Sequence, residues 1–212
     1  MPRRSYDQFC AIARALDVLG ERWTLLIVRE LLGGPRRYSD LLADLPGIST
    51  DVLAARLREM EGDELITRRP IGTRGTASAY ELTGAGTALT GVVEALAGWG
   101  SDRLEARGAT DAVRGHWFAL PLALRFGELA GGRDGVVEVR LEEGVFHLGL
   151  APVTYADGAA ARPDAVVATD HGTAADVASG RATLPEAVRA GRATVTGDTP
   201  LAGALSGRAV AV

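Results

Sequence analysis

The sequence predicts an α+β protein built from two domains. In the N-terminal half, apolar residues recur at helical spacing, and only one pair of short strand-like runs interrupts them. In the C-terminal half, β-branched and alternating runs are separated by short helical segments, which is typical of helices packed on an antiparallel sheet. The stretch from Gly108 to Gly115 has the composition of a linker, so we place the domains at 1–108 and 109–212.

The composition limits the kinds of protein that this chain can be. Its 212 residues suffice for two modest domains, and contents of 47% hydrophobic and 24% charged residues describe a soluble globular protein. No apolar run approaches the roughly 18 residues that span a bilayer, and the N-terminal MPRRSYDQ lacks the apolar segment of a signal peptide. We therefore expect a cytoplasmic protein with no membrane partner.

Residues 48–60 predict a helix with one buried side and one exposed side. Ser49 and Thr50 offer capping hydroxyls, and Leu53, Leu57 and Met60 follow at i, i+4 and i+7, as on a helix packed against a core. Small and polar residues lie outside that stripe, on a surface that faces either a DNA groove or bulk water. The helix by itself leaves both alternatives open.

The segments on either side of this helix complete a DNA-binding arrangement. A turn carrying Arg36 and Arg37 and a short helix precede it, and two β-branched runs at 65–69 and 79–82 follow it, joined by a loop at 70–76. That order is a winged helix-turn-helix, in which the second helix enters the major groove and the hairpin contacts the backbone or the minor groove. The residues that we expect to contact double-stranded DNA are Arg36, Arg37, Ser49, Thr50, Ala55, Arg56, Arg58, Arg68, Arg69 and Arg74.

The overall charge does not favour DNA. The formal net charge is -4, so binding must come from a local patch of arginines against an acidic background. All 23 basic residues are arginine, the side chain that suits bidentate contacts to guanine or phosphate. The alternative, which the high alanine and glycine content favours, is that the absence of lysine reflects a GC-rich coding bias.

The N-terminal half resembles the HxlR-type branch of the winged-helix regulators. The resemblance runs from about Cys10 to Leu104 and rests on the residue types and spacing at 15–27, 34–41, 45–49, 53–60 and 80–83. It implies a homodimeric, sequence-specific DNA-binding protein that acts near promoters, often as a repressor and sometimes as an activator. A two-fold dimer also implies a pseudo-palindromic operator.

Helices outside the motif offer apolar faces for dimerisation. We expect helices at 10–19 and 23–32, and a long helix capped by Thr83 that runs to about Ala106. Apolar residues recur along the last one at Leu89, Val92, Val93, Leu96 and Trp99. In the resembled family this helix and the first helix form the dimer interface, whereas the alternative is that it packs within its own chain.

The C-terminal half predicts an α+β domain with an antiparallel sheet. Its expected helices are at 118–126, 173–178, 184–190 and 200–205, and its expected strands at 136–141, 145–150, 165–169 and 193–196. Over about 117–205 it resembles a sterol-carrier-protein-type lipid-binding domain, through residues 163–167, 175–180, 184–187, 190–191 and 195–198. The resemblance implies a small apolar or aromatic effector held between sheet and helices, although the same side chains would equally fill a core. The candidate ligand-binding residues are Phe118, Leu122, Phe126, Phe146, Leu148, Val177 and Leu201.

The single cysteine provides a competing sensor. Cys10 cannot form an internal disulfide, and it lies where members of the resembled family often carry a cysteine, some of which sense oxidants or electrophiles. The alternative is a small buried hydrophobe on the first helix, because only neighbours that depress its pKa would make the thiol reactive.

Catalytic motifs do not emerge from the sequence. His116, His147 and His171 are far apart and in no metal-binding spacing, and no nucleophile elbow, Walker loop or dinucleotide fingerprint occurs. We therefore expect no enzyme, no cofactor and no metal. The sequence favours a DNA-binding transcriptional regulator, with repression as the expected effect, whose C-terminal domain senses an apolar ligand; the alternative is a thiol-based regulator acting through Cys10, with a purely structural C-terminal domain.

Overall fold

The computed structural model describes residues 5–71, 78–101, 103, 108, 110–151 and 153–208. The chain divides into two compact units, Met1–Val93 and Glu94–Val212. The division falls inside one helix, upstream of residue 108, where the sequence places the domain boundary; that boundary stays a prediction. Within the described residues, no helix is both long and apolar enough to cross a membrane.

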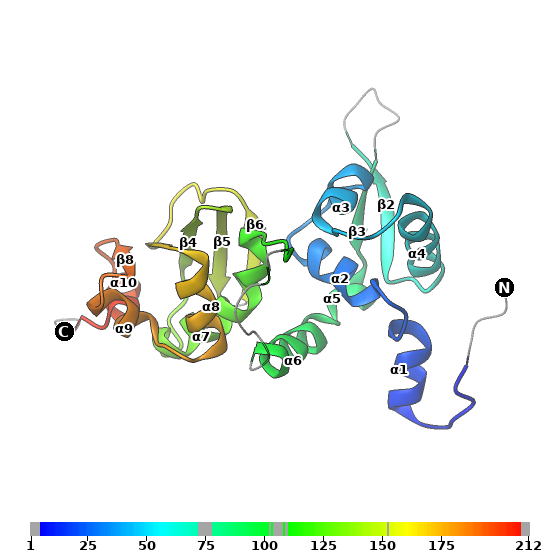
Figure 1. Cartoon of the computed structure of the whole chain (residues 1–212), viewed down its shortest axis with the longest axis horizontal. Coiled ribbons are helices and arrows are strands. Elements are labelled where there is room, and N and C mark those ends of the chain that lie inside the picture. Colours follow the sequence, from blue (N-terminus) through cyan, green and yellow to red (C-terminus); the bar gives the residue numbers. More distant parts are fainter. Residues whose placement is uncertain are drawn as a thin grey trace. The chain divides into compact units, whose positions relative to one another are not determined.

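The first unit has the predicted winged helix-turn-helix order (Figure 1). Its elements are α1 (Ala11–Leu19), α2 (Thr24–Leu32), β1 (Arg36–Arg37), α3 (Tyr38–Asp44), α4 (Thr50–Gly62), β2 (Ile66–Pro70), β3 (Ser78–Leu82), α5 (Gly84–Thr87) and the start of α6 (Thr90–Ser101). The three strands form an antiparallel sheet in the order β1-β3-β2, with Arg36 opposite Tyr80 and Arg68 opposite Tyr80 on the other side. Because β3 lies in the middle, the turn before α3 and the hairpin after α4 belong to one sheet.

The helix α4 forms as its sequence predicts. Ser49 is its N-cap, and the Ser49 Oγ accepts a hydrogen bond from the Val52 N–H at 3.3 Å. The predicted stripe of Leu53, Leu57 and Met60 is buried. The direction of this stripe decides which side of α4 faces outward.

The long helix expected after Thr83 is broken in two. Thr83 does cap a helix, since its Oγ1 accepts from the Gly86 N–H at 3.1 Å, but that helix, α5, has only four residues. A Cβ atom at Gly86 would lie 2.1 Å from the Leu65 carbonyl oxygen, so this glycine lets α5 approach the start of the hairpin closely. A turn follows before α6, which ends at Ser101; of the expected continuation to 106 only residue 103 is described, and it lies in a turn.

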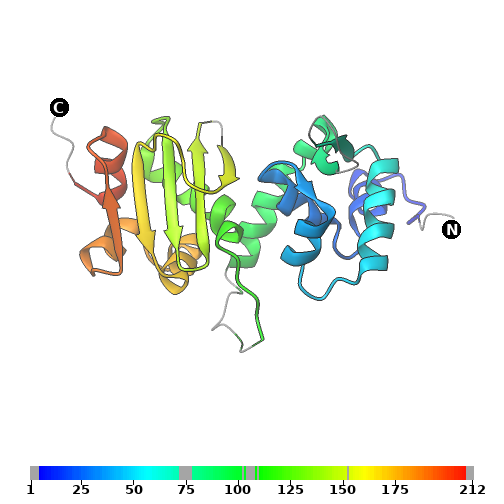
Figure 2. The same cartoon turned by 90° about the horizontal axis from the view of Figure 1, so that it is seen from above.

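The second unit combines a five-stranded sheet with five helical segments beyond α6 in its described residues. These elements are the 3-10 helix η1 (Gly115–Phe118), α7 (Ala119–Ala130), β4 (Val136–Leu141), β5 (Gly144–Leu150), β6 (Val153–Asp157), β7 (Ala165–Thr169), α8 (His171–Ser179), α9 (Leu184–Arg189), β8 (Ala193–Thr196) and α10 (Pro200–Ser206). The strand order is β6-β5-β4-β7-β8 (Figure 2). The helices α7 and α8 pack on one face of this sheet.

The sheet is mixed, which corrects the expectation of an antiparallel sheet. The strands β4 and β7 pair in parallel, with Val137 opposite Ala165, whereas the other neighbouring pairs are antiparallel. The chain returns after β6 over 158–164 to the start of β4, where the Asp164 N–H donates to the Val136 carbonyl oxygen at 2.8 Å, so that β7 runs in the same direction as β4. The sequence analysis also missed the strand β6, because its run of five residues buries only Tyr155.

The return segment 158–164 is tied to the sheet by a buried acid. Glu138 lies in β4, where 2% of its surface is exposed, and its Oε2 accepts from the Ala160 N–H at 2.9 Å. Its Oε1 accepts from the Arg140 Nε at 2.7 Å. A buried carboxylate is tolerated here because both oxygens are hydrogen-bonded.

The helix α8 offers a test of the second unit's stability. Asp170 is its N-cap, with Oδ1 accepting from the Thr173 N–H at 2.8 Å and Oδ2 from the Thr173 Oγ1 at 2.9 Å. The Thr173 N–H lowers the pKa of Asp170 from its usual 3.8, although desolvation opposes this effect. Because the folded pKa is the lower one, the charged cap stabilises the fold above pH 3.8, and that stabilisation is lost as the pH falls through the folded pKa.

Asp170→Ala should lower the free energy of unfolding by about 1 kcal/mol at neutral pH, and by progressively less as the pH falls below about 4. Urea unfolding of wild type and variant between pH 7 and pH 2 measures this difference. Asp170→Asn, which keeps a capping oxygen without the charge, is the matched control and should lose less stability at pH 7. A difference that does not change with pH would contradict the role of the charge.

Candidate nucleic-acid interface

The outward side of α4 is the centre of the candidate interface. Seen along the helix, the residues opposite the buried stripe are Asp51, Ala55 and Arg58, with Val52 and Glu59 beside them. All except the half-buried Ala55 are exposed. Two acids, an apolar side chain, a small residue and an arginine therefore share this surface.

The first turn of α4 is held in place by two hydrogen bonds. The Ser49 Oγ is engaged in capping, so this hydroxyl already has a backbone partner. The Tyr38 hydroxyl, from the first residue of α3, donates to the Thr50 carbonyl oxygen at 2.7 Å. This second bond fixes the start of the recognition helix to the helix before it, and the sequence analysis had not assigned a role to Tyr38.

Arg56 lies at the flank of α4 and is paired with two acids. Its Nη2 lies 3.3 Å from the Glu21 Oε2, in the connection between α1 and α2, and its Nη1 pairs with Glu59. Only 15% of the Arg56 side chain is exposed. Contact between Arg56 and a base, as the sequence analysis predicts, stays a prediction, and it would require these ion pairs to open.

The two arginines ahead of α3 differ sharply in exposure. Arg37 is exposed, and its backbone N–H donates to the Asp40 Oδ2 at 3.2 Å. Arg36 is 12% exposed, donating from Nε to the Glu30 carbonyl oxygen at 3.1 Å and from Nη1 to the Asp44 Oδ2 at 3.4 Å. Arg37 is thus able to reach a phosphate, whereas Arg36 connects α2 to α3 inside the unit.

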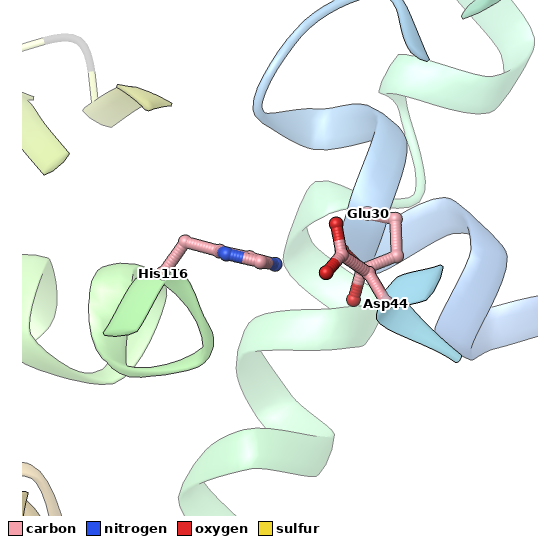
Figure 3. Close-up of side chains that lie close together, drawn as sticks. All are labelled: Glu30, Asp44 and His116. Carbon is pink, nitrogen blue, oxygen red and sulfur yellow. The ribbon is translucent and has the colours of Figure 1, made fainter. Parts of the chain in front are cut away.

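The carboxylates of Glu30 and Asp44 lie within 4.8 Å of each other (Figure 3). Glu30 is fully buried, and Arg29 donates to its Oε1 from Nη2 at 2.6 Å and from Nε at 3.0 Å. Two nearby carboxylates repel each other unless cations intervene, and Arg29 and Arg36 supply those charges. His116, the third side chain labelled in Figure 3, belongs to the second unit, where its Nδ1 lies 3.8 Å from the Asp157 Oδ1.

The strands of the wing carry two exposed arginines. The Arg68 Nε donates to the Ser78 Oγ at 2.6 Å, and its guanidinium lies 5.9 Å from the centre of the Tyr80 ring. Burial raises the pKa of Tyr80, although Arg68 acts in the opposite direction, so its hydroxyl stays protonated at neutral pH. The Arg69 Nε pairs with the Glu81 Oε2 at 3.3 Å. Arg74, at the predicted tip of the wing, lies outside the described residues.

In the second unit, most of the candidate ligand-binding residues belong to a closed core. A cavity of about 10 Å³ lies between α7, α8 and the sheet, lined by Leu122, Phe126 and Val177 among others. That volume is roughly the space of one water molecule. Phe146, Leu148 and Leu201 are buried but do not line this cavity, and Phe118 is half-buried.

Cys10 is exposed at the position preceding α1. The expectation of a small buried hydrophobe therefore does not describe its surroundings within this chain. Exposure makes the thiol accessible, but accessibility alone does not make a thiol reactive.

Comparison with known proteins matches the N-terminal part of the chain. A family model described as HxlR-like helix-turn-helix matches residues 18–107. The HTH-type transcriptional regulator YodB of Bacillus subtilis (strain 168) is 36% identical over 85 residues, which are 40% of this chain and 76% of YodB. The uncharacterized HTH-type transcriptional regulator YvaP of the same organism is 35% identical over 92 residues, which are 43% of this chain and 85% of YvaP.

Among solved structures, quinone-bound YodB from B. subtilis shares 34% sequence identity and covers 44% of this chain and 99% of its own, with a TM-score of 0.39. At this score the superposition adds nothing to the sequence relationship. The matches to YodB and YvaP each cover less than half of this chain.

The ion pair between Glu21 and Arg56 should be measurable by a double-mutant cycle. We expect Glu21→Gln and Arg56→Gln each to lower the free energy of unfolding, with a coupling of up to about 1 kcal/mol, because the Glu21 end is solvent-exposed and screened. Arg56→Gln combined with Glu61→Gln, an acid on the same helix, is the control and should be additive. Additivity in the Glu21 cycle would show that this ion pair contributes nothing in solution.

Proposed function

This chain belongs to the HxlR-like helix-turn-helix family of transcriptional regulators, and we propose that it represses transcription by binding a pseudo-palindromic operator as a homodimer. Regulators of this family act on DNA and are not enzymes. One observation carries the proposal for the contact surface: the exposed side of α4, Arg37 ahead of α3 and the arginines of the wing strands belong to one winged helix-turn-helix.

The distribution of charge supports distinct roles for the arginines. Arg37 and Arg58 are exposed, and Arg58 makes one local bond, from its Nε to the Ala54 carbonyl oxygen at 3.2 Å. Such side chains neutralise phosphates, which supplies affinity for any duplex. Arg68 and Arg69 would add contacts from the wing after giving up weak surface bonds. Ser49 and Thr50 would approach the groove through the first turn of α4.

Exposed apolar faces support the dimer. In the part of the first unit that precedes and forms α1, Tyr6, Phe9, Ile12 and Leu16 are all exposed, Ile12 at 71%. The helix α6 carries a second set at Val92, Leu96 and Trp99. Exposed apolar side chains gathered on a helix are typical of a protein interface. A second copy of the chain would cover them and would supply the two-fold symmetry that a pseudo-palindromic operator requires.

The effector is the least constrained part of the proposal. We favour a small apolar or aromatic molecule bound between α7, α8 and the sheet, in keeping with the likeness to sterol-carrier-protein-type domains. The cavity of about 10 Å³ is too small for such a molecule, so binding would require α8 to move away from α7. The alternative sensor is Cys10, since an exposed thiol beside the apolar residues of α1 would change that face on oxidation.

DNA binding should depend on Arg37 and Arg58 through phosphate contacts. Arg37→Ala or Arg58→Ala should weaken operator and random DNA alike and reduce the slope of log K against log salt by about 0.9 for each phosphate that is no longer neutralised. Arg162→Ala, an exposed arginine of the second unit, is the matched control and should leave the slope unchanged. Titrations at several salt concentrations, with footprinting of the operator, provide the measurement. Two symmetric protected half-sites are expected; a single unsymmetric one would contradict the dimer.

The two sensors can be separated with the full-length protein. If the second unit is the sensor, an apolar fluorescent dye should bind wild type and Cys10→Ser equally and change operator affinity in both. If Cys10 is the sensor, hydrogen peroxide should release wild type but not Cys10→Ser from the operator, and the dye should have no effect. Release by peroxide alone would rule out the favoured sensor.

A further inference from the structure

The side of α4 that would face a DNA groove carries an unusual apolar residue. Val52 is 43% exposed in the first turn of the helix, next to Asp51 and one turn before Ala55. The buried stripe on the opposite side fixes this orientation, because turning Val52 inward would expose Leu53 or Leu57. A large part of this valine side chain is therefore presented to the solvent on α4.

The polar neighbours of Val52 are already engaged. The Ser49 hydroxyl accepts the Val52 N–H, and the Arg56 guanidinium is paired with Glu21 and Glu59. The arginine nearest to Val52 along the helix is therefore held at the flank. Among the exposed positions at the start of α4, the side chains of Thr50, Asp51 and Val52 take part in none of the hydrogen bonds and ion pairs of the described residues, and Val52 is the apolar one of the three.

We infer that Val52 reads the C5-methyl group of a thymine in the major groove. The thymine methyl is the one apolar group on the major-groove edge of a base pair, and apolar side chains recognise it by contact. A branched valine in the first turn offers two methyl groups for that contact. The inference rests on the proposed placement of α4 in the major groove.

Asp51, the residue before Val52, restricts which bases can lie at this end of α4. A carboxylate accepts hydrogen bonds and repels the acceptor-rich edge of guanine, whereas it accepts from the amino group of cytosine. It also repels phosphates, so its presence beside Val52 argues that this end of α4 faces base edges and leaves backbone contacts to Arg37 and Arg58. The expected half-site thus contains a thymine contacted by Val52, with no guanine presented to Asp51.

Replacing thymine by uracil removes only the methyl group and tests the contact directly. For each thymine of the footprinted operator in turn, binding of the uracil-substituted duplex is compared with that of the unmodified one. For wild type, one position in each half-site should show a loss of about four-fold, the value of one buried methyl-sized group. Val52→Ala should bind both duplexes equally at that position. Val52→Ile keeps the apolar contact, so its binding should still weaken when that thymine is replaced by uracil.

The control is Val145→Ala, an exposed valine in the second unit, which should respond to uracil as wild type does. An operator that binds tightly but is insensitive to uracil at every position would overturn the inference and leave the proposed function intact. The inference is also overturned if Val52→Ala keeps the uracil effect. If no DNA sequence is protected at low salt, the proposed function fails, and the inference fails with it.

Discussion

The packing of Leu53, Leu57 and Met60 into the core of the first unit is the constraint on which the candidate interface depends. An α-helix has only about two residues per turn to place on each side, so burying this stripe decides which residues of α4 face outward. The Tyr38 hydroxyl fixes the first turn, and Glu21 holds Arg56 at the flank. Three contacts from three different segments therefore orient one recognition helix.

The arginines show how an acidic protein can carry a DNA-binding surface. With a formal net charge of -4, the chain uses many of its arginines within the fold, as in the bonds of Arg36 to the Glu30 carbonyl oxygen and to Asp44. The exposed Arg37 and Arg58 remain for external anions. A count of positive residues therefore overstates the contact surface, because exposure and ion pairing decide which charges a duplex would meet.

In the second unit, the packing of the core competes with space for a ligand. Its sheet buries Val137, Val139, Phe146 and Leu148, and the cavity beside the sheet measures only about 10 Å³. Residues that would line a ligand site also make a well-packed core, and the static arrangement favours the packed state. Any effector of apolar character must then bind at the expense of packing between helices and sheet, so its binding and the stability of this unit would be linked.

Elements with local signals can be predicted from the amino-acid sequence. The capping hydroxyl of Ser49, the helical spacing of Leu53, Leu57 and Met60, and the paired β-branched runs predict α4 and its hairpin correctly, because each signal lies within a few residues of its element. Family membership follows from the same region. The same helical spacing places Val52 outside the buried stripe, so its exposure could also have been predicted from the sequence.

Features that depend on residues far apart in the sequence are set by the packing of the folded chain. Arg36 and Arg37 are adjacent and chemically identical, yet one is tied to Glu30 and Asp44 and the other is exposed, because the turn before α3 directs them to opposite sides of a small sheet. Glu21 meets Arg56 across 35 residues. The parallel pairing of β4 with β7 depends on the segment 158–164, which brings the chain back to the start of β4 before β7 begins. Pairing partners, strand direction and exposure are set by the packing of the whole unit, which no local pattern encodes.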